Sequence, residues 1–286
     1  MTLRVAAVQM NSGDDKAANL AQAEQLIEQA TQGGAQLVAL PELWTYLGPA
    51  QGNAANAETI PGPLINRLAA LARRHQITLH CGSMLEAPDA PGVNPRPYNT
   101  AAVLNPDGQI IAKYRKIHLF DANPSGSAAP YMESESIQPG SEIVTFEAEG
   151  VQIGLATCYD LRFPEVFRIL ALRGAQLILL ASAFTMQTGR DHWEVLVRAR
   201  AIENGLYLLA PNQVGAHPPG RNTYGRSMLV DPWGTVLAQA PDVPGVILAE
   251  ISLKRLADVR RQIPSLANRQ PQAYRWPEAE KVPAHV

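Results

Sequence analysis

The sequence is poor in cysteine and has no long apolar run. Its 286 residues include only two cysteines, Cys81 and Cys158. Two cysteines do not make the disulfide framework of a small secreted protein, so both are expected to remain thiols in a reducing compartment. No apolar run approaches the roughly 20 residues that cross a bilayer. Residues 1–5 enter strand-like sequence without a signal-peptide pattern. We therefore expect a cytoplasmic protein with no membrane partner.

An excess of charge of one sign is also missing. The chain has 24 Lys and Arg against 26 Asp and Glu, a formal net charge of -2. This balance gives no electrostatic reason to expect nucleic acid as a partner. The six histidines form no metal-binding helix motif, and there is no Cys-x-x-Cys pair. Neither a metal nor another cofactor is therefore expected.

What the sequence does have is an alternation of strand-like and helix-like segments, which indicates an α/β fold. The segments Gly34-Ala35-Gln36-Leu37 and Gly174-Ala175-Gln176-Leu177 each end a helix and open a strand, which suggests two related βαβ-like halves. We predict a single domain over residues 1–286, with a core at 1–266 and an irregular tail at 267–286. Residues 121–140, rich in Pro, Ser and Gly, are predicted to form a long ordered loop of the kind that often carries function. Strands are predicted at 3–10, 36–40, 77–84, 101–104, 109–113, 151–157, 176–180, 206–210, 227–230, 236–239 and 246–251, and helices at 14–32, 64–75, 164–173 and 191–203.

Cys158 stands where an α/β protein places its reactive groups. It closes the apolar strand 151–157, and Pro164 marks the start of the next helix. Ligands gather at the carboxyl ends of such strands, and backbone N–H groups at a helix start can face an oxyanion. A nucleophilic thiol is one interpretation, and a buried structural cysteine is the other. Cys81 lies inside a strand, where a core position is expected.

A nucleophilic cysteine needs a base or a lowered pKa, because the thiolate is the reactive form. Glu42 follows a strand between Pro41 and an apolar pair, so it could act as a base in a partly dry site or remain a surface charge. Lys116 could stabilise an oxyanion or remain a solvated strand end. Strand-like alternation predicts that Lys116 and His118 share one face. His118 therefore offers a competing Cys–His scheme, as in thiol proteases.

Three motifs stand in the order Leu40-Pro41-Glu42, Tyr114-Arg115-Lys116-Ile117-His118-Leu119 and Thr157-Cys158-Tyr159-Asp160-Leu161-Arg162-Phe163-Pro164-Glu165. In these motifs and their order the sequence resembles the nitrilase superfamily, whose members use a Glu–Lys–Cys triad. The resemblance implies that Glu42 is the general base, Lys116 the oxyanion stabiliser and Cys158 the nucleophile, with Glu133 as a second glutamate beside the triad. It also implies a four-layer αββα sandwich and a homodimer or higher homo-oligomer.

Further motifs at 184–189, 192–204 and 224–234 resemble the deaminated-glutathione amidase branch of that superfamily. They imply a thiol amidohydrolase that cleaves the amide of deaminated glutathione, through a Cys thioester, to 2-oxoglutarate and Cys-Gly. The neighbouring ω-amidase branch, which acts on 2-oxoglutaramate, shares much of this pattern. A catalytically silent binding protein on the same scaffold also stays open. Substrate binding is expected from Tyr159, Arg162, Phe184 and Thr185, although Arg162 could instead pair with Asp160 or Glu165.

Overall fold

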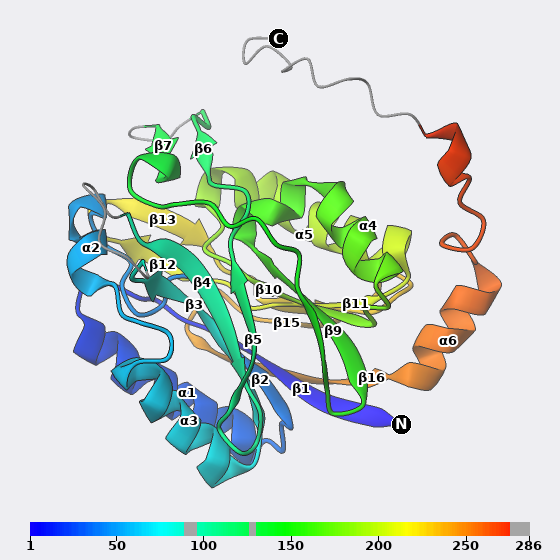
Figure 1. The fold of residues 1–286 in the computed structure, drawn as a ribbon, viewed down its shortest axis with the longest axis horizontal. Helices are drawn as coiled ribbons and strands as arrows, with labels where there is room; N and C mark the ends of the chain where they lie inside the picture. The colour runs from blue at the N-terminus through cyan, green and yellow to red at the C-terminus, as the bar shows by residue number, and fades with distance from the viewer. Residues whose placement is uncertain (89–95, 126–129, 275–286) are drawn as a thin grey trace.

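Two six-stranded β-sheets stack face to face, and helices cover the outer face of each sheet (Figure 1). The structure is a computed structural model that describes residues 1–88, 96–125 and 130–274. This is the four-layer αββα sandwich that the sequence led us to expect. The first sheet has the order β16 (Gly245–Ser252), β1 (Thr2–Gln9), β2 (Leu37–Ala39), β3 (Thr78–Glu86), β4 (Tyr98–Leu104) and β5 (Ile110–Arg115). The second has the order β15 (Val236–Gln239), β14 (Met228–Val230), β11 (Tyr207–Ala210), β10 (Leu177–Ala181), β9 (Val151–Thr157) and β8 (Thr145–Ala148).

The helices divide between the two outer faces, and two small hairpins lie at one end of the sandwich. Helices α1 (Lys16–Gln32) and α3 (Pro63–His75) pack on the first sheet, and helices α4 (Pro164–Leu172) and α5 (Met186–Asn204) pack on the second. The hairpins are β6 (Asp121–Ala122) with β7 (Tyr131–Met132), and β12 (Val214–His217) with β13 (Arg221–Tyr224). The remaining helical segments are α2 (Asn53–Asn56), α6 (Leu253–Gln262) and the 3₁₀ turns η1 (Ala50–Gly52), η2 (Glu133–Glu135), η3 (Cys158–Arg162) and η4 (Pro271–Ala273).

The strand sequences explain why there are four layers. Successive side chains of a strand point to opposite faces of its sheet. In β1, Val5 and Ala7 belong to the core between the two sheets, whereas Ala6 and Val8 belong to the core beneath α1 and α3. Both faces of β1 are apolar because both are covered, as in other buried parallel strands. A third apolar core lies between the second sheet and helices α4 and α5.

The repeated Gly-Ala-Gln-Leu segment marks equivalent positions in the two sheets. Each copy opens the second of three parallel strands, β2 in one sheet and β10 in the other. The Gln36 side-chain oxygen accepts the backbone N–H of Arg4 at 3.2 Å, and the Gln176 oxygen accepts that of Gln152 at 3.0 Å. Each glutamine thus adds a side-chain hydrogen bond that extends the pairing to the preceding strand. The expectation of two related halves is confirmed at the level of hydrogen bonding.

Helix α5 begins five residues before the predicted start at 191. The segment 186–190 contains Thr188 and Gly189, which are poor helix formers. An added Cβ at Gly189 would lie 2.3 Å from the Cβ of Tyr224, so glycine is required there by the close approach of β13. Packing against the hairpin therefore overrides local propensity. The predicted irregular tail contains the short turn η4, and residues 275–286 of that tail lie outside the described part of the chain.

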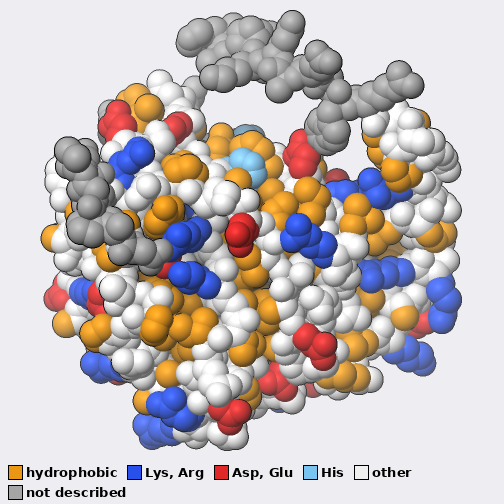
Figure 2. All heavy atoms as spheres, in the orientation of Figure 1, with side chains coloured by type: hydrophobic (Ala, Val, Ile, Leu, Met, Phe, Trp, Pro, Cys, Tyr) orange, Lys and Arg blue, Asp and Glu red, His pale blue; other side chains and the backbone are white. Residues whose placement is uncertain are grey.

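The surface carries charges of both signs. On the face shown in Figure 2, basic and acidic side chains are interspersed rather than gathered by sign. Within residues 1–88, 96–125 and 130–274, no helix has the length and apolar character needed to cross a membrane.

His80 makes the stability of the fold depend on pH. It is fully buried in β3, and neither ring nitrogen has a hydrogen-bond partner among the described residues. Burial lowers the pKa of His80 from 6.5 to about 4, with a small opposing effect from the backbone of Leu40. Between these two values the unfolded chain binds a proton that the folded chain excludes, so stability falls as the pH falls through this window.

We therefore expect the protein to be about 2 kcal/mol less stable at pH 5 than at pH 8 through His80 alone. Urea unfolding at a series of pH values measures this, with His80→Gln compared against wild type. Since glutamine does not titrate, the free energy of unfolding of His80→Gln should depend much less on pH between 5 and 8. A substitution of the exposed His192, His192→Gln, should leave this pH dependence unchanged. The same pH dependence of the free energy of unfolding in His80→Gln and wild type would contradict the prediction.

Candidate active site

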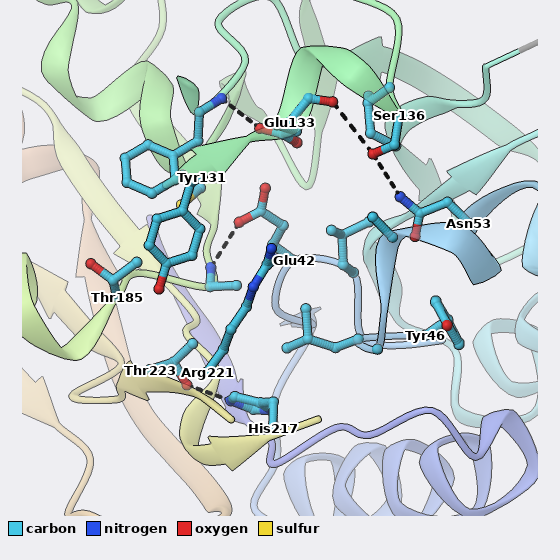
Figure 3. A pocket seen from close by; sticks show the side chains of 18 of the residues that line it. Glu42, Tyr46, Asn53, Tyr131, Glu133, Ser136, Thr185, His217, Arg221 and Thr223 are labelled. Carbon is cyan, nitrogen blue, oxygen red and sulfur yellow. Dashed lines mark hydrogen bonds between the residues drawn. The ribbon is translucent and has the colours of Figure 1, made fainter. Parts of the chain in front are cut away.

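Three strand ends bring Glu42, Lys116 and Cys158 to one pocket. Glu42 follows β2, Lys116 follows β5 and Cys158 follows β9. Their exposures are 3%, 2% and 8%. Lys116 Nζ lies 2.9 Å from Glu42 Oε1 and 2.8 Å from Oε2 of Glu133, which η2 contributes from the 121–140 loop. The four residues that the sequence nominated as catalytic therefore form one cluster, and two of them, Glu42 and Glu133, are labelled in Figure 3.

The backbone at Cys158 is held in an uncommon conformation. Its φ is +43°, a value that costs energy for a residue with a side chain and persists only where the surroundings impose it. The buried Asp160 carboxylate accepts hydrogen bonds from Thr157 N at 2.8 Å and from the Tyr114 hydroxyl at 2.6 Å. These bonds tie η3 both to the end of β9 and to β5, the strand that precedes Lys116. As expected, Cys158 comes directly after strand 151–157, and the next α-helix begins at Pro164.

Hydrogen bonds fix both oxygens of the Glu42 carboxylate. Oε2 accepts the backbone N–H of Ala183 at 2.8 Å, and Oε1 accepts the side-chain amide of Asn99 at 2.8 Å. Glu133 in turn accepts the backbone N–H of Phe120 at 2.7 Å, besides its bond to Lys116. Asn99 and Ala183 were not predicted from the sequence. Neither residue type signals a site. Asn99 reaches Glu42 from β4 of the same sheet, whereas Ala183 is brought to it by the packing of the second sheet.

The buried charges determine which groups are protonated. Burial raises the pKa of the Cys158 thiol well above its usual value, and the negative charge of Glu42 raises it further, while Lys116 opposes them. Burial alone would lower the pKa of Lys116, but Glu133 and Glu42 outweigh it and raise that pKa well above its usual value. The resting site therefore holds a neutral thiol beside an ammonium group that stays charged. A thiol in that state needs a base before it can attack.

His118 does not take the place that strand alternation predicted. Strand β5 ends at Arg115, so the alternation stops before Lys116. The His118 ring contacts Asp160 through Nδ1 at 2.8 Å and stacks on Phe163 at 3.6 Å between centroids. It is not among the residues that line the pocket. The prediction that Lys116 and His118 share a strand face is wrong, and the geometry gives no support to the Cys–His scheme.

The four residues expected to bind substrate fall into two groups. Thr185 lines the pocket, whereas Tyr159, Arg162 and Phe184 are not among its lining residues. The Arg162 guanidinium lies 5.1 Å from the centroid of the Phe184 ring and 6.0 Å from that of Tyr159, and its Nη1 is 3.1 Å from His192 Nδ1. Within the described chain Arg162 forms no ion pair, so the alternative pairing with Asp160 or Glu165 is absent. Both backbone groups of Phe184 already have protein partners, Asn212 and Tyr224.

The pocket has a volume of about 870 Å³, including space at its open mouth. Much of its wall comes from two segments that sequence reasoning did not single out, residues 43–53 and the β12–β13 hairpin. The turn Pro218-Pro219-Gly220 is a signal that could have found this hairpin, because such residues favour tight turns. Within residues 1–88, 96–125 and 130–274, no three His, Cys, Asp or Glu side chains are grouped to hold a metal ion. Other lining residues that the sequence left unmarked are Tyr46, Asn53, Phe120, Tyr131, Ser136, His217, Arg221, Asn222 and Thr223.

Comparison with known proteins identifies the family. The carbon-nitrogen hydrolase family model matches residues 4–261. The chain belongs to the carbon-nitrogen hydrolase family. It is 43% identical over 267 residues to a deaminated glutathione amidase of Synechocystis sp., covering 92% of this chain and 97% of that protein. It is 37% identical over 273 residues to the human omega-amidase NIT2, covering 96% and 97%.

Solved structures agree with this assignment. The Caenorhabditis elegans NitFhit protein superimposes with a TM-score of 0.87 at 36% identity. The match covers 96% of this carbon-nitrogen hydrolase and 66% of the NitFhit chain. A mutant amidase from Nesterenkonia sp. AN1 superimposes with a TM-score of 0.78 at 28% identity and 94% coverage of both chains. In that structure the acetamide moiety of fluoroacetamide is covalently added to the active-site cysteine. The family and its amidase members show an enzyme that hydrolyses the C–N bond of amides, so the alternative of a silent binding protein is set aside.

Proposed function

We propose that this carbon-nitrogen hydrolase cleaves deaminated glutathione to 2-oxoglutarate and Cys-Gly through a thioester on Cys158. The observation that carries the proposal is the buried cluster in which Lys116 bridges Glu42 and Glu133 beside the neutral thiol. The similarity to a deaminated glutathione amidase over most of both chains supports the substrate. The cysteine adduct in the Nesterenkonia amidase supports a covalent intermediate.

The proposed reaction begins with proton transfer from the Cys158 thiol to Glu42. The thiolate sulfur bonds to the amide carbon, and the C=O electron pair moves to oxygen, giving a tetrahedral oxyanion. Lys116 stabilises this oxyanion by its charge, together with the backbone N–H of Tyr159. Glu133 holds Lys116 in place. The intermediate collapses, the C–N bond breaks, and Glu42 returns the proton to the departing amine of Cys-Gly.

Hydrolysis of the thioester completes the proposed cycle. Glu42 takes a proton from water as the water oxygen bonds to the acyl carbon, and the proton then returns to the sulfur as 2-oxoglutarate leaves. Covalent catalysis of this kind divides one difficult step into two easier ones. Thr185 remains the proposed contact for the acyl portion, from the pocket wall. Arg162 does not line the pocket and is proposed to act on the substrate only through the Phe184 ring, on which its guanidinium packs. Tyr159 contributes its backbone N–H, and Phe184 shapes the site through its ring.

A second candidate function is hydrolysis of 2-oxoglutaramate to 2-oxoglutarate and ammonia. The 37% identity to omega-amidase NIT2 over 96% of this chain favours it. The two substrates share the 2-oxo acyl group, so the same triad serves both. They differ in the leaving group, which is a dipeptide in one and ammonia in the other.

Steady-state hydrolysis of both compounds, followed through the shared product 2-oxoglutarate, separates the two functions. We expect kcat/KM to be at least about tenfold higher for deaminated glutathione, which corresponds to about 1.4 kcal/mol of transition-state discrimination. The reverse ratio would assign the protein to ω-amidase chemistry. Turnover of neither compound would show that the substrate assignment is wrong.

We also propose a cytoplasmic homodimer formed by a single domain. The two free cysteines, Cys81 and Cys158, suit a reducing compartment. Large apolar side chains stand exposed on α4 and α5, with Leu172 at 50%, Val195 at 66% and Ile202 at 50%, and such surface is typical of subunit contacts. The molar mass in solution tests the dimer, and a monomer at all concentrations would exclude it.

A further inference from the structure

Two cationic side chains line the active-site pocket within the described part of the chain, and only one of them is neutralised. Lys116 lies against the carboxylates of Glu42 and Glu133. Arg221, on β13, has no carboxylate within ion-pair distance in residues 1–88, 96–125 and 130–274. Its side chain points from the hairpin into the cavity (Figure 3). The pocket thus offers a free positive charge that the triad does not use.

The hairpin that carries Arg221 is firmly anchored. His217, which pairs with Arg221 across the hairpin, contacts Ser12 O through Nδ1 at 2.6 Å and Thr223 Oγ1 through Nε2 at 2.6 Å. The guanidinium itself lies 4.9 Å from the centroid of the Tyr131 ring. A guanidinium held over an aromatic face keeps its N–H edges free, and those edges fit a carboxylate through two parallel hydrogen bonds. Arg221 is therefore oriented to bind an anionic group of the substrate.

Arg221 lies at the outer part of the pocket. Cys158 and Glu42 are almost fully buried, whereas Arg221 is exposed. Arg221 and Tyr131 also line an adjoining cavity of about 520 Å³, whose other walls include Pro130 and Pro219. A substrate that places its scissile carbonyl at the buried Cys158 therefore extends toward solvent to reach the exposed Arg221.

We infer that Arg221 binds the terminal carboxylate of the peptide leaving group, which makes it the residue that selects a peptide amide over a simple amide. The inference rests on the proposed function. Deaminated glutathione carries a carboxylate at each end, one on the acyl part and one on the glycine of the leaving dipeptide. The glycine carboxylate lies more bonds away from the scissile carbon, so it is the one that fits the outer position of Arg221. The simple amide 2-oxoglutaramate has no such group.

Arg221→Gln tests the inference with three compounds: deaminated glutathione, its analogue with a carboxamide in place of the glycine carboxylate, and 2-oxoglutaramate. We expect the variant to lower the ratio of kcat/KM for deaminated glutathione to that for 2-oxoglutaramate by about tenfold or more, mainly through KM. Wild type should disfavour the carboxamide analogue by a similar factor, and Arg221→Gln should not distinguish it from the acid. Arg221→Lys should recover part of the ratio. Arg226→Gln, which removes an equal charge from an exposed ion pair with Asp242, should leave the ratio unchanged.

An equal loss for all three compounds would overturn the inference, because it would place the acyl carboxylate at Arg221. An unchanged ratio would overturn it as well. If wild type hydrolyses neither natural compound, the proposed function fails separately, and binding decides the inference. Calorimetric titration of Cys158→Ala with the acid and the carboxamide analogue should then show tighter binding of the acid, and this preference should disappear in Cys158→Ala/Arg221→Gln. Equal affinities in Cys158→Ala would overturn the inference.

Discussion

Replacing Cys158 with alanine is expected to lower kcat for amide hydrolysis by about 10⁴-fold or more. The thiol is the group proposed to bond to the substrate, and its neighbours cannot replace it, since Lys116 stays charged and Glu42 is held by three hydrogen-bond donors. The fold should persist, because alanine can be held at the same positive φ by the hydrogen bonds of Asp160. Steady-state assays at high enzyme concentration measure the loss, and thermal unfolding verifies the fold.

Cys81→Ala provides the matched control. This second thiol is fully buried in β3 within the apolar core, and burial raises its pKa far above the usual value. A thiol that stays protonated and out of contact with the pocket has no route to the substrate. We expect this variant to lose some stability but to retain kcat within about twofold. Comparable activity losses in the two variants would contradict the assignment of Cys158, as would substantial turnover by Cys158→Ala.

The candidate catalytic cluster could be predicted from the sequence because its triad residues follow strand ends. Lys116 and Cys158 come directly after β5 and β9, and Glu42 lies three residues after β2, and such positions meet at one end of an α/β sandwich. The Gly-Ala-Gln-Leu repeat likewise carried enough local information to reveal two equivalent halves. In both cases the signal is a short pattern whose physical meaning does not depend on distant residues.

Other parts of the site could not be predicted because they depend on tertiary packing. Asn99 reaches Glu42 from the second residue of β4, and Arg221 enters the pocket from a short hairpin without strong alternation. His118 was placed wrongly because the strand ends at Arg115, one residue before Lys116, and a period of two cannot show where a strand ends. Helix α5 began early because the contact of Gly189 with Tyr224, rather than helix propensity, determines its first turn.

Replacing Glu42 with glutamine should separate formation of the Cys158 thiolate from proton transfer to the leaving amine. Without a carboxylate to take and return protons, we expect kcat for amide hydrolysis to fall by about 10³-fold, within the range of a lost general base. The variant should fold, because Asn99 Oδ1 has no partner among the described residues and a rotated Asn99 amide can accept from the introduced NH₂ group.

The same substitution should make Cys158 more reactive toward an alkylating agent. The negative charge of Glu42 raises the pKa of the thiol, and Lys116 lowers it. Removing the carboxylate therefore lowers the pKa of Cys158 and increases its thiolate fraction at neutral pH. Alkylation by iodoacetamide requires the thiolate but no proton for the departing iodide, so its rate at pH 7 should rise in Glu42→Gln while hydrolysis falls.

Glu133→Gln is the matched variant for this comparison. It removes a negative charge beside Lys116 but keeps Glu42, the carboxylate proposed to carry the proton. Its loss of kcat should be at least about tenfold smaller than that of Glu42→Gln. Parallel loss of alkylation and hydrolysis in Glu42→Gln would mean that the carboxylate serves to orient the thiol instead of moving its proton. An increase in alkylation together with lost turnover requires a base whose proton goes to the leaving amine, and among the described residues Glu42 is the carboxylate whose charge acts most strongly on Cys158.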